Sequence, residues 1–123
     1  MSDKPQISAG TILSVQQLNY ILNGACIMGS GGGGPYTVGQ QVLQYIGTRP
    51  VNLIPASIVP AGYYTAVSAF VGSPDAAANQ VLDFSVAATA FNALSEIVGA
   101  TFPCVLPGEV RRRQSIIAAA APA

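Results

Sequence analysis

Apolar residues recur at helical spacing in the first part of the chain. In residues 14–23 the apolar positions lie three and four apart, which predicts an amphipathic helix. Ser14 and Gln17 have the spacing of a capping box, in which each side chain bonds the backbone N–H of the other residue. We expect this helix to end at Gly24, because glycine is common just past a helix C-terminus. Its apolar face contains Leu18, Ile21 and Leu22, with Ala25 one turn further on.

Two further segments show the same periodicity. A second capping box, Thr37 with Gln40, predicts a helix that ends at Gly47, with an apolar stripe of Val38, Val42, Leu43 and Ile46. A third helix is expected to begin at Asp83 or Ser85. Its predicted buried side consists of Phe84, Ala88, Phe91, Leu94 and Ile97.

Four short segments lack a helical period and have the composition of β-strands. They are residues 25–28, 50–55, 62–72 and 102–107, and the β-branched and aromatic residues of 62–72 make it the strongest of the four. The alternation of helices and strands predicts an α/β fold, a layered domain with a partly parallel sheet flanked by helices.

The domain organisation follows from the absence of any repeat or linker in the sequence. We expect residues 1–123 to form a single α/β domain. Residues 1–12 are expected to be a disordered or extended arm, and residues 114–123 an Ala-rich tail with high helix propensity.

Charge is scarce. Half of the 123 residues are hydrophobic and 8% are charged, where about 25% is usual, and the formal net charge is zero. Much of the surface must therefore be uncharged, and electrostatic repulsion does not keep copies of the chain apart. This composition predicts an obligate oligomer, or a domain taken from a larger protein.

Several classes of partner are not supported by the sequence. The basic residues Lys4, Arg49 and Arg111 to Arg113 are too few to cover a nucleic-acid backbone, so we expect no nucleic-acid partner. No apolar run approaches the roughly 18 residues of a membrane helix, and the N-terminus has no apolar signal region. These features predict a cytoplasmic location without membrane contact, and they leave export by another route open.

The cysteines and the lack of histidine limit the available chemistry. Cys26 and Cys104 each lie in an apolar run, which favours buried, reduced thiols; a disulfide requires the two runs to be neighbours. The chain has no histidine, which removes the commonest general base and metal ligand. We therefore expect no metal site and no cofactor.

The most unusual motif is the glycine run between residues 25–28 and the second helix. It matches the dinucleotide pattern G-x-G-x-x-G, but a run this rich in glycine matches trivially, and no acidic residue follows between Asp3 and Asp75. Pro35 and Tyr36 occupy the Lys and Ser/Thr positions of a phosphate loop. Three interpretations remain open: backbone N–H groups that bind an anion or a carbonyl oxygen, close packing of another backbone such as that of a partner subunit, or a flexible turn. The candidate ligand-binding residues are Gly29, Ser30, Gly31, Gly32, Gly33 and Gly34.

Three stretches in order give the chain a family resemblance. "NGACIMGSGGGGPYTVG", "AFVGSPDAAA" and "FPCVLPGEV" resemble the N-terminal domain of the S-methyl-thiohydantoin desulfurase family, over about residues 14–110. After Glu109 the sequence departs from the family, which continues Gly-Gly-x-Asn where this chain has Val110 and three arginines. The resemblance therefore implies a truncated and divergent member of the family, and we expect the family's C-terminal domain to be missing.

The resemblance implies hydrolysis of a small S-methylated thiohydantoin with release of methanethiol. Glu109 would be the base, Asp75 a second carboxylate, and the N–H groups of Gly31 to Gly34 the oxyanion donors. Alternative roles are an ion pair of Glu109 with the arginines that follow it, and a helix N-cap for Asp75. Cys104 is a poor nucleophile, because no histidine or nearby lysine lowers its pKa.

Two functions therefore follow from the sequence. The first is a self-associating structural subunit on the family scaffold, forming a homo-oligomer or an open helical filament. The second is the ligand-binding half of a C–S hydrolase, inactive alone. The low charge favours the first function, and the glycine motif with Glu109 favours the second.

Overall fold

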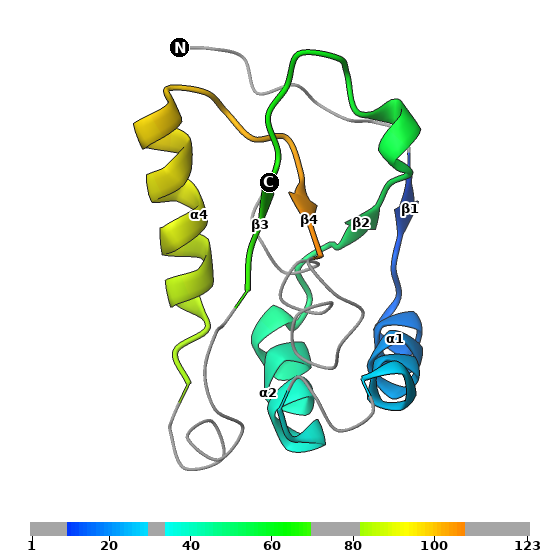
Figure 1. Ribbon diagram of the computed structural model, residues 1–123. Helices are drawn as coiled ribbons and strands as arrows, with labels where there is room; N and C mark the ends of the chain where they lie inside the picture. Colours follow the sequence, from blue (N-terminus) through cyan, green and yellow to red (C-terminus); the bar gives the residue numbers. More distant parts are fainter. Residues whose placement is uncertain (1–9, 30–33, 70–81, 108–123) are drawn as a thin grey trace.

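The computed structural model describes residues 10–29, 34–69 and 82–107 (Figure 1). Helices and short strands both occur in these ranges, which confirms the α/β class. In chain order the elements are β1 (Thr11–Ile12), α1 (Val15–Met28), α2 (Tyr36–Ile46), β2 (Asn52–Leu53), a 3₁₀ turn (Ala56–Ile58), β3 (Ala66–Val67), α4 (Ser85–Val98) and β4 (Val105–Leu106).

The described strands form two separate pairs. β1 and β2 are antiparallel, with Thr11 opposite Leu53, whereas β3 and β4 are parallel, with Ala66 opposite Val105. Three of the predicted strands are present but shorter than expected: residues 50–55 contain β2, residues 62–69 contain β3, and 102–107 contain β4. The partly parallel arrangement is therefore present as one two-stranded pair.

The hydrophobic core lies between α1 and α2, which are adjacent in Figure 1. Its buried members are Leu18, Leu22, Val42, Ile46 and Val51. Gly39 of α2 is a point of close contact, because a Cβ atom there would collide with the side chain of Leu22. The hydroxyl of Tyr36 also donates a hydrogen bond to Oδ1 of Asn23 at 3.0 Å, which joins the two helices.

The start of α1 is as predicted, and its end is not. The N–H of Gln17 donates to Oγ of Ser14 at 3.2 Å, and the N–H of Ser14 donates to Oε1 of Gln17 at 2.8 Å, which completes the capping box. The helix continues through Gly24 to Met28, so the predicted stop at Gly24 and the predicted strand at residues 25–28 are both wrong.

Packing explains this longer helix. Ala25 is buried and Cys26 packs against the core, so both extend the apolar face begun by Leu18 and Leu22. A glycine inside a helix costs about 1 kcal/mol relative to alanine. Burying another turn against α2 offsets that cost, and tertiary contact therefore overrides the local stop signal at Gly24.

The second helix is confirmed, although its predicted cap is wrong. α2 begins one residue before Thr37, with Pro35 as N-cap and no side-chain hydrogen bond to the cap, so Thr37 and Gln40 do not form a capping box. Proline before the first turn presets the backbone angle that a helix needs. α2 ends as predicted at Gly47, whose φ of 57° is left-handed and whose N–H donates to the carbonyl of Leu43 at 3.1 Å.

The third predicted helix is confirmed as α4, but its buried side is narrower than expected. Phe91 is buried, whereas Leu94 is 43% and Ile97 83% exposed, so burial of these two residues was predicted wrongly. Steps of three residues rotate backwards by about 60° each, which moves Leu94 and then Ile97 away from Phe91 around the helix. The Phe91 ring meets Phe102 edge-on, with 5.4 Å between centroids, and this contact holds α4 against the segment leading to β4.

The predicted arm and tail lie mostly outside the described residues, which begin at Gly10 and end at Pro107. At the end of the arm, Thr11 and Ile12 form β1 and pair with β2.

Candidate functional site

The glycine run connects two helices. Gly29 ends α1 in a right-handed helical conformation, and its N–H donates to the carbonyl of Ala25 at 2.9 Å. Gly34 is buried and directly precedes Pro35, the N-cap of α2. The rest of the run lies outside the described residues; it consists of Ser30, Gly31, Gly32 and Gly33.

This connection removes the structural context of a dinucleotide site. The dinucleotide fingerprint requires a strand before the glycines and a helix after them. Here the preceding element is α1, because residues 25–28 are helical. The structure thus gives a second reason, besides the missing acidic residue, to exclude that cofactor.

Gly34 is a glycine for reasons of backbone conformation. Its φ is +87°, a value that residues with a Cβ rarely adopt, and no atom of the described residues lies within 4 Å of where a Cβ would be. The positive φ of Gly34 turns the chain sharply just before α2 begins, and this turn requires a glycine. The interpretations of the glycine run all stay predictions, because residues 30–33 lie outside the described residues.

Both predicted catalytic carboxylates, Asp75 and Glu109, lie outside the described residues. The strands that precede them are described: β3 ends at Val67 and β4 at Leu106. Because these strands are parallel, their carboxyl ends lie at the same edge of the pair. Asp75 and Glu109 thus follow, along the chain, two strands whose ends the fold brings together.

Both cysteines are free thiols and half-buried, which confirms the reduced state. Cys26 packs against the α1–α2 core. Burial raises the pKa of the Cys104 thiol above its ordinary value, so less of it is thiolate at neutral pH. This direction agrees with packing, and it opposes a nucleophilic role.

Charged side chains are rare across the described surface. In residues 10–29, 34–69 and 82–107 they are Arg49, Asp83 and Glu96. Arg49 is held against α2: its Nη1 donates to the carbonyl of Tyr45 at 2.6 Å, and its guanidinium lies 4.8 Å from the centre of the Tyr45 ring. These ranges contain no cluster of three potential metal-ligating side chains and no helix long and apolar enough to cross a bilayer.

Large apolar side chains, by contrast, are widely exposed. Among the described residues, those at least half exposed are Ile12, Val15, Tyr20, Ile27, Met28, Leu53, Tyr64, Val67, Val86 and Ile97. Nine of them occur on β1, α1, β2, β3 and α4, and Tyr64 lies just before β3. Scattered exposed apolar residues are normal on proteins, but on this chain few charges separate them.

Residues 16–121 match the sequence profile of a family described as "S-Me-THD-like, N-terminal domain". The chain belongs to this family. The family match confirms the resemblance seen in the motifs, and it extends past Glu109 into the segment where the sequence departs from the family pattern. No curated protein and no solved structure matches the chain.

Proposed function

We propose that this chain is a self-associating subunit built on the S-Me-THD-like N-terminal domain, which forms a homo-oligomer or a filament. The observation that carries the proposal is the exposed apolar surface with few charges. Ile97 is 83% exposed, Ile27 79% and Met28 69%, values that a second copy of the chain would lower by covering these side chains.

The electrostatics of the surface support the same function. Residues 10–29 and 34–69 together carry one charged side chain, Arg49, and its charge is engaged by Tyr45. Contact between two copies over this region therefore brings no like charges together and desolvates few ions.

The strand pairs add a further reason. Within the described residues each pair has two strands, β1 with β2 and β3 with β4. A two-stranded pair has an outer edge on each strand, and such edges are sites where other chains add by hydrogen bonding. Repetition of one such contact in the same direction would give a filament, whereas a twofold contact would give a closed dimer.

Sedimentation velocity of the pure chain over a concentration series tests the proposal. We expect the weight-average mass to rise with concentration above the 12.5 kDa of one chain. Electron microscopy of the same samples distinguishes closed particles from filaments. A chain that sediments as a compact monomer at several hundred micromolar contradicts the proposal.

A second candidate is the binding of a small thiohydantoin-type heterocycle, as one half of a C–S hydrolase. The family match favours it, together with the common edge at which β3 and β4 end before Asp75 and Glu109. In this function the glycine run contributes backbone N–H groups as oxyanion donors, and Glu109 acts as the base.

Calorimetric titration with a small S-methylated thiohydantoin tests this candidate on the wild-type chain and on Glu109→Gln. We expect saturable binding that Glu109→Gln weakens at least tenfold, with Glu96→Gln on the outer side of α4 as a control that binds normally. Binding that is absent from the wild type, or equal in all three proteins, contradicts this role.

A further inference from the structure

The outer side of α4 has an ordered apolar pattern. Val86, Ala90, Ala93 and Ile97 follow one another at intervals of four, three and four residues, which places them on one face of the helix. All four are exposed, Val86 at 51% and Ile97 at 83%. We call these four residues the outer stripe.

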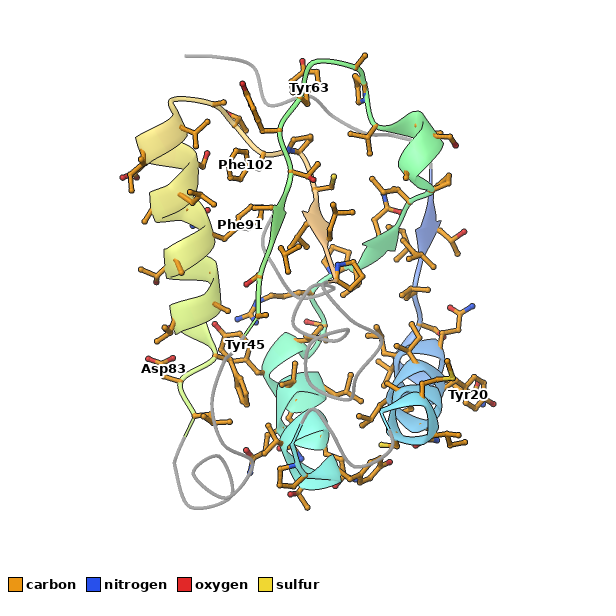
Figure 2. All side chains as sticks on the ribbon, in the orientation of Figure 1. Tyr20, Tyr45, Tyr63, Asp83, Phe91 and Phe102 are labelled. Carbon is orange, nitrogen blue, oxygen red and sulfur yellow. The ribbon has the colours of Figure 1, made fainter. Side chains whose placement is uncertain are left out.

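The outer stripe faces away from the rest of the molecule. Figure 2 shows Phe91 and Phe102 between α4 and the two strands β3 and β4. Residues of the outer stripe lie about 100–160° around the helix from Phe91. In Figure 1, α4 stands at one side of the molecule, so this face has none of the labelled elements against it.

A surface helix of a soluble domain normally has polar residues on its outer face. α2 follows that rule, with Gln40, Gln41 and Gln44 exposed. α4 follows it only in part: its exposed polar residues Thr89, Asn92 and Glu96 lie on one flank, whereas the flank that carries the outer stripe is apolar and exposed. The outer stripe therefore indicates a contact beyond the described chain.

We propose that the outer stripe binds the same stripe of a second copy, with the two α4 helices antiparallel about a twofold axis. This inference rests on the proposed self-association and identifies its surface. The stripe has the same order of large and small residues in both directions: Val86 meets Ile97 of the second copy, and Ala90 meets its Ala93. A twofold contact requires this kind of self-complementarity.

Residue size and charge both suit this pairing. The two alanines at the centre allow the helix backbones to approach closely, and the larger Val86 and Ile97 fill the space at the ends. Glu96 lies in the last turn of α4, where the negative end of the helix dipole disfavours a carboxylate. The antiparallel pair brings Glu96 level with Ala87 of the second copy, in its first turn, where the partial charge is positive.

The other charged residue near this surface is Asp83, two residues before the start of α4. Its carboxylate is hydrogen-bonded within its own chain. Its Oδ1 accepts hydrogen bonds from the N–H of Ser85 at 2.9 Å and from the hydroxyl of Ser85 at 2.6 Å. In the antiparallel pair, Glu96 of the second copy is level with Ala87. Asp83 precedes Ala87 by four residues, so the two carboxylates are separated by about 6 Å along the helix axis. No charged residue belongs to the stripe itself.

The size of the contact predicts its strength. A helix of 14 residues is about 21 Å long and about 10 Å wide, so the pair covers much less than the roughly 800 Å² per partner of a standard stable interface. We expect a weak dimer in rapid exchange, with a dissociation constant in the range of tens to hundreds of micromolar.

Sedimentation velocity of Ala93→Glu and Asn92→Glu tests the stripe. Both variants add the same charge to adjacent, exposed positions of α4, and Asn92 lies about 130° around the helix from the centre of the stripe. We expect Ala93→Glu to weaken association at least tenfold and Asn92→Glu to change it less than twofold. Circular dichroism shows that both variants remain folded.

A mixing experiment tests the antiparallel register. Ile97→Glu and Val86→Lys should each associate poorly alone, because each places a charge in the apolar contact. Their mixture should form a dimer, because the carboxylate introduced in one chain then faces the ammonium group introduced in the other. In a parallel pair the same two positions lie about 16 Å apart along the helix axis, so the two charges do not meet.

The outcomes separate the two proposals. A monomeric wild type overturns both self-association and the stripe. A wild type that associates while Ala93→Glu and Asn92→Glu behave alike overturns the stripe alone, and another surface then carries the assembly. Association that Ala93→Glu weakens but that the mixture does not restore overturns the antiparallel register.

Discussion

The helices α2 and α4 are similar in length but differ in how the fold uses them. α2 buries Val38, Val42 and Ile46 against α1 and has glutamines outside. α4 buries Phe91 alone among its own residues, and one flank of its outer side is apolar. The comparison separates two modes of packing: α2 is buried along one face against α1, while α4 is held by the Phe91–Phe102 contact and, at its start, by Phe84 and Ala87 against the core.

We expect the two regions to differ most in the free energy of unfolding that is lost when a leucine is replaced by alanine. Leu22 is fully buried at the centre of the α1–α2 core, and we expect Leu22→Ala to lower the free energy of unfolding by about 4 kcal/mol. Leu94→Ala on α4 should lower it by less than about 1 kcal/mol, because that side chain is 43% exposed. Urea unfolding measures both. Equal losses would show that α4 belongs to the stabilising core.

The two mid-helix glycines should respond in opposite directions to the same substitution. A methyl group at Gly39 collides with Leu22, so Gly39→Ala should destabilise the fold by about 1–3 kcal/mol. Nothing lies within 4 Å of a Cβ at Gly24, so Gly24→Ala should stabilise it by up to about 1 kcal/mol. Thermal unfolding of the two variants checks the sign. The contact between α1 and α2 is looser than described if both substitutions stabilise.

The helix caps provide a smaller test. Ser14→Ala removes the hydrogen bond to the N–H of Gln17 and should cost about 1 kcal/mol. Thr37→Ala should change stability by less than about 0.5 kcal/mol, because Thr37 does not cap α2. Urea unfolding of this pair of variants is the measurement. A loss at Thr37 as large as at Ser14 would mean that the second capping box forms after all.

The smallest expected effect is a pH dependence at the start of α4. The side chain of Ser85 and, to a smaller extent, its backbone N–H donate hydrogen bonds to Asp83. These bonds lower the pKa of Asp83 below its ordinary value of 3.8. These hydrogen bonds to the ionised Asp83 therefore stabilise the folded state fully above about pH 5. The stabilisation is lost as the pH falls through 3.8 and below, because Asp83 is then protonated. Ser85→Ala should raise the pKa of Asp83 in an NMR titration, while a Thr89→Ala control on the same helix leaves it unchanged. An Asp83 pKa that is insensitive to Ser85→Ala contradicts this account.

Much of the fold could be predicted from local sequence signals. The Ser14 capping box, Gly47 and the apolar stripe of α2 are local features, and they appear as expected. The errors arose where distant contacts decide the outcome. Gly24 resembles a helix stop, but Ala25 and Cys26 pack against the core and extend α1. Similarly, the apolar residues of α4 gave no indication of which of them would face the strands, and Ile97 proved to be exposed.

The candidate site was predicted less completely than the fold. The sequence identified the family, and the match to residues 16–121 confirms it. The φ of +87° explains why residue 34 is a glycine, while its predicted role in ligand binding stays a prediction. Asp75 and Glu109 remain predictions, because both lie outside the described residues. The sequence analysis did not identify the outer stripe: of its four residues only Ile97 was considered, and it was assigned to the buried side.

The parallel pairing of β3 with β4 also has a kinetic consequence. It joins Ala66 to Val105, so a long intervening segment that includes α4 must be brought back before the first hydrogen bond forms. α1 and α2 are close neighbours along the chain and meet after a much shorter loop. During refolding, the two-helix half should therefore become protected from hydrogen exchange first, with the crossover through α4 following as a slower phase.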